Sequence, residues 1–194
     1  MILTRAPLRV SLAGGGTDLP AFYSKHGGHI LSFAINRYVY IALNAKFDGS
    51  VRMSYSETEN VDHVSQLQHA LARAVLTEVG IERGIEIVSV SDVPSTGTGL
   101  GASAAYLAAL IRATYTFLGT TASPSLIADL GFRIESEDLG QPVGRQDHLA
   151  AAHGGINEFV IATDGSSTIL PVKMNDSIAE MLECNTVLVY TGRG

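Results

Sequence analysis

Apolar stretches bounded by turn residues recur along the chain and predict a set of β-strands. These stretches are rich in β-branched and aromatic residues, which is typical of strands. The polar pair Asn36-Arg37 lies between two of them, and such a short polar step suggests a hairpin. The predicted strands cover residues 8–13, 29–35, 38–45, 51–55, 85–91, 158–162, 168–172 and 187–190.

Apolar residues at helical spacing predict α-helices between the strands. Ser123 and Pro124 form a good helix start, because serine caps a helix and proline is tolerated at its first position. Glycines at positions 80, 119 and 154 follow the other periodic segments and mark helix ends. The predicted helices cover residues 63–79, 102–118, 124–137 and 146–153.

Composition and charge narrow the class of protein. The length of 194 residues suits one large domain or one and a half small ones. The net charge is −6, and an acidic chain without a basic stripe is a poor nucleic-acid binder. The single cysteine, Cys184, excludes an internal disulfide and any cysteine-rich metal site, and we expect it to be a small buried residue.

The sequence predicts neither a signal peptide nor a membrane span. The first ten residues, MILTRAPLRV, lack a long apolar segment and a cleavage site, and no apolar run approaches the length of a membrane span. We therefore expect a cytoplasmic protein with small-molecule partners and no membrane or nucleic-acid partner. A strand of buried type immediately before Gly194 is unusual, so we also expect the chain to have been cut short. The alternative is an unusual natural end.

A glycine-rich segment, PSTGTGLGASAA at residues 94–105, predicts a phosphate-binding loop that runs into the helix at 102–118. Glycine lets backbone N–H groups approach phosphate oxygens, and a helix N-terminus favours negative charge. Ser103 lies in the first turn, where its hydroxyl could reach magnesium or phosphate. The segment is neither a Walker A loop nor a Rossmann fingerprint. The alternative is a flexible turn before a core helix.

Two further groups of residues carry candidate chemistry. In the N-terminal segment RVSLAGGGTD, Arg9 offers a fixed cation, and Asp18 offers acceptors for sugar hydroxyls. The alternative is a turn capped by Asp18 beside a surface arginine. Glu135 and Asp147 lie twelve residues apart, on either side of a glycine-containing loop. For that pair the alternative is two acidic residues on a helix surface.

These segments, taken together, resemble the motifs of the GHMP kinases, the family of galactokinase, homoserine kinase, mevalonate kinase and phosphomevalonate kinase. GLGASA at residues 99–104 resembles the second family motif. Ala102 stands where serine is usual, and Pro94 lies slightly further from Gly99 than is commonest. The triple glycine of APLRVSLAGGGTDLP is similar to that of the D-glycero-D-manno-heptose 7-phosphate kinase group. Fucokinase-type domains carry a related version.

The resemblance implies an α+β fold of the ribosomal protein S5 domain 2 kind, with an unusual left-handed βαβ crossover. Residues 1–194 would form the N-terminal, ATP- and sugar-binding domain, and the family's C-terminal domain would be missing. The implied cofactors are ATP and Mg²⁺. Ser103 and Glu135 would hold the metal, Asp147 would be the catalytic base and Arg9 would stabilise the transferring group. The implied ligand-binding residues are Gly15, Gly16, Thr17 and Asp18 for the sugar and Gly97, Thr98, Gly99, Leu100, Gly101, Ala102 and Ser103 for the nucleotide.

The function implied is transfer of phosphate from ATP to the anomeric hydroxyl of D-glycero-D-manno-heptose 7-phosphate, which gives the 1,7-bisphosphate. Lys25, Arg37 and Arg145 are candidate partners for the substrate's own phosphate, although for each of them a solvated surface charge is the favoured interpretation. Two alternatives stay open. One is another sugar-1-kinase of the fucokinase or galactokinase kind, and the other is a sugar- and nucleotide-binding module without catalytic activity.

Overall fold

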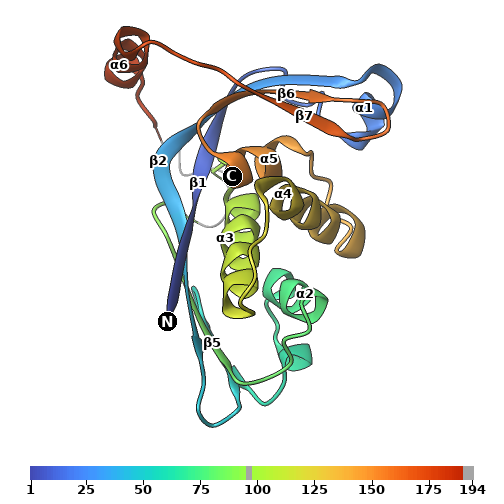
Figure 1. Ribbon diagram of the computed structural model, residues 1–194, viewed down its shortest axis with the longest axis vertical. Helices are drawn as coiled ribbons and strands as arrows, with labels where there is room; N and C mark the ends of the chain where they lie inside the picture. The colour runs from blue at the N-terminus through green and yellow to red at the C-terminus, as the bar shows by residue number, and fades with distance from the viewer. Residues whose placement is uncertain (95–97, 190–194) are drawn as a thin grey trace.

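The computed structural model describes residues 1–94 and 98–189, and its framework is one open, mixed β-sheet (Figure 1). The strands follow the order β4-β3-β5-β2-β6-β7, and β1 pairs with β2 outside that path. The pair β3–β5 is parallel, and the other described pairs are antiparallel. The strands are β1 (Ile2–Ala13), β2 (Gly28–Ala45), β3 (Val51–Ser54), β4 (Thr58–Val61), β5 (Ile85–Ser91), β6 (Ile156–Ile161) and β7 (Ser167–Pro171).

β2 is one long strand, so the predicted hairpin at Asn36-Arg37 is wrong. Pro7 pairs with Tyr38 and Arg9 pairs with Ala34, which leaves one residue of β1 opposite three of β2. The polar step is therefore a bulge, which bends the strand without reversing it. β1 pairs with β2 on both sides of the bulge and keeps the two halves running in the same direction.

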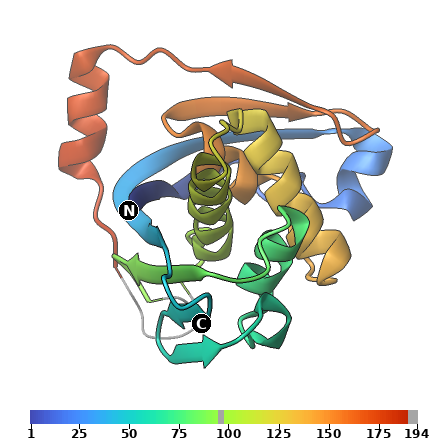
Figure 2. The same ribbon diagram turned by 60° about the horizontal axis from the view of Figure 1, so that its bottom comes forward.

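Helices cover one face of the sheet and leave the other face open (Figure 2). The central helix α3 packs against β1 and β2, and it also contacts α2, α4 and α5. An extra helix near the C-terminus, α6, stands away from this layer and buries none of its residues. The helices are α1 (Pro20–His26), η1 (Val64–Gln66), α2 (Ala70–Glu78), α3 (Ala102–Phe117), α4 (Pro124–Arg133), η2 (Ile134–Asp138), α5 (Gln146–His153) and α6 (Asp176–Asn185).

The core lies between α3 and the covered face of the sheet. Leu107 and Leu110 of α3 are fully buried, as are Leu8, Ile30 and Ile41 of the central strands. Complete burial of each such side chain contributes about 1.5–3 kcal/mol. α3 is apolar on nearly every side because neighbours surround it, which is typical of a central helix. The glycine loop, which we define as residues 94–101, is thereby fixed at its C-terminal end to the most buried element of the fold.

Three of the predicted helices are confirmed, and the fourth is shorter than predicted. The predictions for residues 102–118, 124–137 and 146–153 correspond to α3, to α4 with η2, and to α5. Within residues 63–79, a 3₁₀ turn comes first and α2 begins only at Ala70. His69 causes the late start, because its side chain accepts a hydrogen bond from the Ala72 amide and caps α2.

The C-terminal region differs from the prediction. Residues 187–189 form no strand, while Tyr190 lies outside the described residues. Cys184 lies on α6 and is exposed, so the expectation that it is buried is wrong. The physical reason is that α6 stands away from the helical layer and buries none of its residues. Each described helix is too short or too polar to span a bilayer.

Candidate active site

Arg9 connects three segments that are distant in sequence. Its Nε and Nη2 atoms lie 2.7 and 2.5 Å from Oδ1 of Asp147. Nη1 donates to the carbonyl of Gly99 at 2.7 Å, and the Arg9 amide donates to the carbonyl of Leu100 at 3.1 Å. The guanidinium thus holds the glycine loop and the start of α5 together. The β2 bulge lies opposite Leu8, the residue before Arg9 on β1, and bulges are over-represented next to active sites.

The described part of the glycine loop, Thr98 to Gly101, ends at the start of α3. Gly101 is the N-cap, with a φ of +76° that favours glycine, and no side chain of the described residues caps this helix. A Cβ atom at Gly101 would lie 3.2 Å from Oδ2 of Asp147, so the loop is in close contact with this carboxylate. Since no side chain of the described residues caps this helix, the amides of its first turn are available to an anion within the described part of the chain. Gly97 lies outside the described residues.

Glu135 and His148 form a buried polar pair behind the loop, beside the partly buried Ser103. Glu135 accepts a hydrogen bond from Nε2 of His148 at 2.9 Å. Burial alone raises the pKa of Glu135, but the His148 ring and the nearby Ser103 hydroxyl outweigh burial and bring the pKa below its ordinary value. Glu135 therefore stays ionised although its side chain is only 7% exposed. It lies in the π-helical turn η2, a conformation that is frequent at functional sites.

This polar group fits a magnesium ion. A hydroxyl and a carboxylate are hard oxygen donors, and Mg²⁺ is usually bound through one or two carboxylates together with substrate phosphates. The described residues contain no cluster of three acidic, histidine or cysteine side chains that could enclose a metal by themselves. Ser103 and Glu135, next to an anion-binding helix start, therefore match the donor set that a magnesium–nucleotide complex requires.

The N-terminal loop, which we define as residues 14–19, lies beside the start of α5. The backbone of Gly15 and Gly16 is exposed. The Thr17 hydroxyl donates to the carbonyl of Gly14 at 2.7 Å and accepts from the His29 amide at 3.1 Å. Asp18 is buried, and its carboxylate accepts hydrogen bonds from backbone amides. The loop therefore presents mainly glycine backbone at its surface, while its polar side chains bond within the protein.

The candidate cations for a substrate phosphate have different surroundings. Nη1 of Arg145 lies 2.8 Å from Asp129, and its guanidinium carbon stacks over the Phe132 ring at 4.5 Å. Arg37 lies in the β2 bulge and donates to the carbonyl of Asn36. Lys25 lies in the last turn of α1. Arg145 is thus already neutralised by a neighbour.

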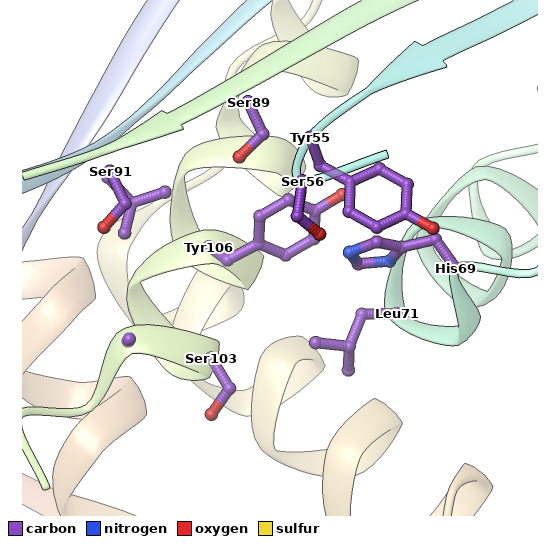
Figure 3. A pocket seen from close by; sticks show the side chains of 10 residues that line it. Tyr55, Ser56, His69, Leu71, Ser89, Ser91, Ser103 and Tyr106 are labelled. Carbon is purple, nitrogen blue, oxygen red and sulfur yellow. The ribbon is translucent and has the colours of Figure 1, made fainter. Parts of the chain in front are cut away.

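A cavity of about 450 Å³ lies next to Ser103, between β-strands and the helices α2 and α3 (Figure 3). The His69 ring lies between two tyrosine rings, with centroid distances of 4.7 Å to Tyr55 and 4.9 Å to Tyr106. Burial lowers the pKa of His69, and the buried Tyr106 hydroxyl has no hydrogen-bond partner among the described residues. These aromatic walls suit a flat ring such as a nucleobase. The remaining lining residues are Val39, Ser56, Leu71, Ser89, Ser91 and Ala102.

The structure brings the predicted residues together and adds some that sequence reasoning missed. Arg9 bonds both Gly99 and Asp147, and Ser103 lies near enough to Glu135 to lower the pKa of that carboxyl. His148 was missed, although its position directly after Asp147 in the QDH run was an available signal. The aromatic cavity was also missed. Its rings come from three separate elements, so no local pattern could indicate it.

Comparisons with known proteins give sequence relatives of this chain. The sequence model of the GHMP kinases N terminal domain matches residues 65–155. The chain is 32% identical to D-glycero-alpha-D-manno-heptose 7-phosphate kinase of Campylobacter jejuni, over 98% of this chain and 59% of that protein. It is 27% identical to galactokinase of Thermotoga maritima, over 77% of this chain and 43% of that protein.

A solved structure shows the same fold. The crystal structure of a D-glycero-D-manno-heptose 1-phosphate kinase from Bacteroides thetaiotaomicron matches with a TM-score of 0.88 and 28% identity, over 94% of this chain and 63% of that one. The expected α+β fold class is therefore confirmed, and the handedness of the β3–α2–β5 crossover stays a prediction. The chain spans less than two thirds of the length of each of these relatives.

Proposed function

We propose that this chain, whose residues 65–155 match the GHMP kinases N terminal domain, forms the ATP- and sugar-binding part of a sugar kinase. The acceptor is the anomeric hydroxyl of D-glycero-D-manno-heptose 7-phosphate, and the product is the 1,7-bisphosphate. The observation that carries this proposal is the double contact of Arg9. One guanidinium bonds both the Asp147 carboxylate and the carbonyl of Gly99, so the candidate base lies directly against the phosphate-binding loop.

In the proposed reaction, Asp147 orients the sugar hydroxyl and accepts its proton. The hydroxyl oxygen attacks the γ-phosphorus of ATP, the bond to the β-phosphate oxygen breaks, and ADP leaves. Arg9 supplies a fixed positive charge beside the transferring group. Phosphoryl transfer has a loose transition state, so positioning and electrostatic stabilisation supply most of the catalysis. Arg9 and Asp147 hold each other in place and meet the first of these needs.

The nucleotide would occupy the glycine loop and the aromatic cavity. The free amides at the start of α3 would bind its phosphates, and the rings of Tyr55, His69 and Tyr106 would contact its base. Ser103 and Glu135 would hold Mg²⁺, which neutralises phosphate charge when it is bound. The cavity borders Ser103, so one molecule of ATP could fill both places. The exposed backbone of Gly15 and Gly16, with Thr17, would contact the sugar.

The Campylobacter relative supports the choice of a heptose phosphate as acceptor. The Bacteroides relative is named for a heptose 1-phosphate, so the position of the phosphate already present on the acceptor needs a direct test. The Thermotoga relative favours a second candidate, a galactokinase-like enzyme that takes an unphosphorylated sugar. The partial coverage of all three relatives leaves a third candidate, a binding module without turnover.

An ADP-release assay separates these candidates. The chain, with ATP and Mg²⁺, is offered heptose 7-phosphate, heptose 1-phosphate, unphosphorylated heptose, galactose and fucose. ADP release that depends on heptose 7-phosphate supports the proposal. Release with unphosphorylated sugars alone contradicts it in favour of the second candidate, and sugar binding without ADP release supports the third.

Asp147→Asn tests the role of the candidate base. General base catalysis contributes about 100-fold or more, so kcat should fall by at least about that factor. Asp48→Asn is a suitable control, because Asp48 lies in an exposed turn between β2 and β3, far along the chain from the site. Unchanged turnover in the Asp147 variant would remove this residue from the mechanism.

A further inference from the structure

Asp18 is buried inside a loop whose other residues are largely exposed. Only 6% of Asp18 is accessible, whereas Gly15 and Gly16 on the same loop are exposed. Each carboxylate oxygen accepts a backbone amide. Oδ1 accepts from Gly16 at 3.1 Å, and Oδ2 accepts from Gln146 at 3.0 Å. The side chain therefore offers little free surface to a bound sugar.

The second of these amides belongs to the first residue of α5. The first four amides of a helix have no partner inside the helix, and they carry partial positive charge. No side-chain cap is formed by Arg145, the residue before α5. Asp18 replaces that missing cap from elsewhere in the chain. Its carboxylate accepts the Gln146 amide, and its backbone carbonyl accepts the Arg145 amide at 3.2 Å.

Gly144, just before α5, shows how close the approach is. A Cβ atom at this position would lie 1.9 Å from Oδ2 of Asp18, well inside contact distance. The φ angle of Gly144 is one that any residue can adopt. Glycine is needed here because a side chain would collide with Asp18. The loop after β1 and the loop before α5 are therefore fitted to each other.

We propose that Asp18 is a positioning residue that caps α5 from outside and thereby sets the place of Asp147. Asp147 is the residue that follows Gln146, so the helix turn held by Asp18 is the turn that carries the candidate base. This assignment differs from the expectation that Asp18 binds a sugar hydroxyl. It rests on the proposed function only for the role of Asp147, because the cap itself is a structural property.

The cap can be tested without catalysis by amide hydrogen exchange. In the unmodified chain the Gln146 amide should be protected, and exchange at the rate of an unstructured peptide would overturn the proposal. Asp18→Asn keeps the shape of the side chain but leaves only one acceptor oxygen for two amides. Loss of a helix cap should speed exchange of the α5 first turn about fivefold. Asp48→Asn makes the same substitution at a carboxylate that accepts a backbone amide in a remote turn, and it should leave α5 unchanged.

The link to Asp147 is tested by kinetics and a double variant. Asp18→Asn should lower kcat about tenfold through misplacement of the base, while KM for the sugar changes less than about twofold. In an Asp147→Asn background the same change should have no further effect on kcat. A raised KM, together with a full effect in that background, would show a direct sugar contact and overturn the proposal. An inactive wild-type chain with a protected Gln146 amide would count against the proposed function alone.

Discussion

Gly101 offers a sharp test of the contact between the glycine loop and the candidate base. Gly101→Ala places a methyl group on a residue whose φ is +76°, and a left-handed backbone costs a non-glycine residue about 1–2 kcal/mol. The same methyl carbon would lie 3.2 Å from Oδ2 of Asp147, so the carboxylate must shift by a few tenths of an ångström. The variant therefore combines a stability cost with a displacement in the site.

Gly119 provides a matched control at the other end of α3. Its φ is +74°, and a Cβ atom there would meet nothing within 4 Å. Gly119→Ala thus carries the same backbone strain without touching the site. For a chain of this length, each kcal/mol lowers Tm by about 2–4 °C, so both variants should melt about 2–8 °C below the wild type.

The two variants should differ in activity. Misplacement of a catalytic group can cost up to about 100-fold, so we expect kcat of Gly101→Ala to fall by about 10- to 100-fold. Gly119→Ala should keep wild-type turnover at a temperature where all three proteins are folded. Differential scanning calorimetry gives the two stabilities, and the ADP-release assay gives the rates. Equal rates in the two variants would refute the argument that Gly101 is glycine in order to admit the Asp147 carboxylate.

Three further predictions concern other residues of the site. Glu135→Gln should raise the Mg²⁺ concentration needed for half-maximal nucleotide binding by about tenfold, because loss of a metal ligand weakens metal binding by about that factor. Glu137→Gln changes an exposed residue on the same turn and should leave that concentration unchanged. Equal curves for the two variants in calorimetric titrations would contradict the assignment of Glu135. Arg9→Lys should lower kcat about 100-fold, because one ammonium group cannot replace a guanidinium that bonds Asp147 and the glycine loop at the same time. Full activity of this variant would show that the double contact of the guanidinium is dispensable. Burial lowers the pKa of His69 below 6.5, so as pH falls the unfolded chain takes up a proton that the folded chain resists. The free energy of unfolding should therefore decrease from pH 7 to pH 5, by at most about 1.4 kcal/mol per pH unit for this group. His69→Asn keeps the cap of α2 and should flatten that dependence in denaturant titrations, and parallel curves would refute the effect.

Local signals explain which elements could be predicted. α3 is a long apolar segment that ends before Gly119, and α5 ends before Gly154, so both helices were predicted within one residue. Their start and stop signals lie within a few positions of the helices themselves. The strand β5 was predicted correctly for the same reason.

Long-range pairing explains the errors. The choice between a hairpin and a bulge at Asn36-Arg37 depends on β1, which lies more than twenty residues away and pairs across the step. The sequence predicted that Arg9, Ser103, Glu135 and Asp147 have chemical roles, but not which of them touch. The Asp18 carboxylate faces the Gln146 amide because two loops pack together, and these two residues are 128 positions apart in the sequence.

The bulge in β2 has a consequence for how this scaffold can diversify. Residues 39–45 of β2 pair with β5 on the side of the aromatic cavity, and residues 28–33 pair with β6 on the side of the N-terminal loop. A shift of one residue in the pairing register of a strand turns its core face outward. The bulge between these two segments already breaks the regular pairing, so the register of one segment does not fix the register of the other. The half beside the N-terminal loop can therefore accumulate substitutions on its exposed face while the half beside the aromatic cavity keeps its geometry. Acceptor choice and nucleotide use become separable traits of one continuous strand.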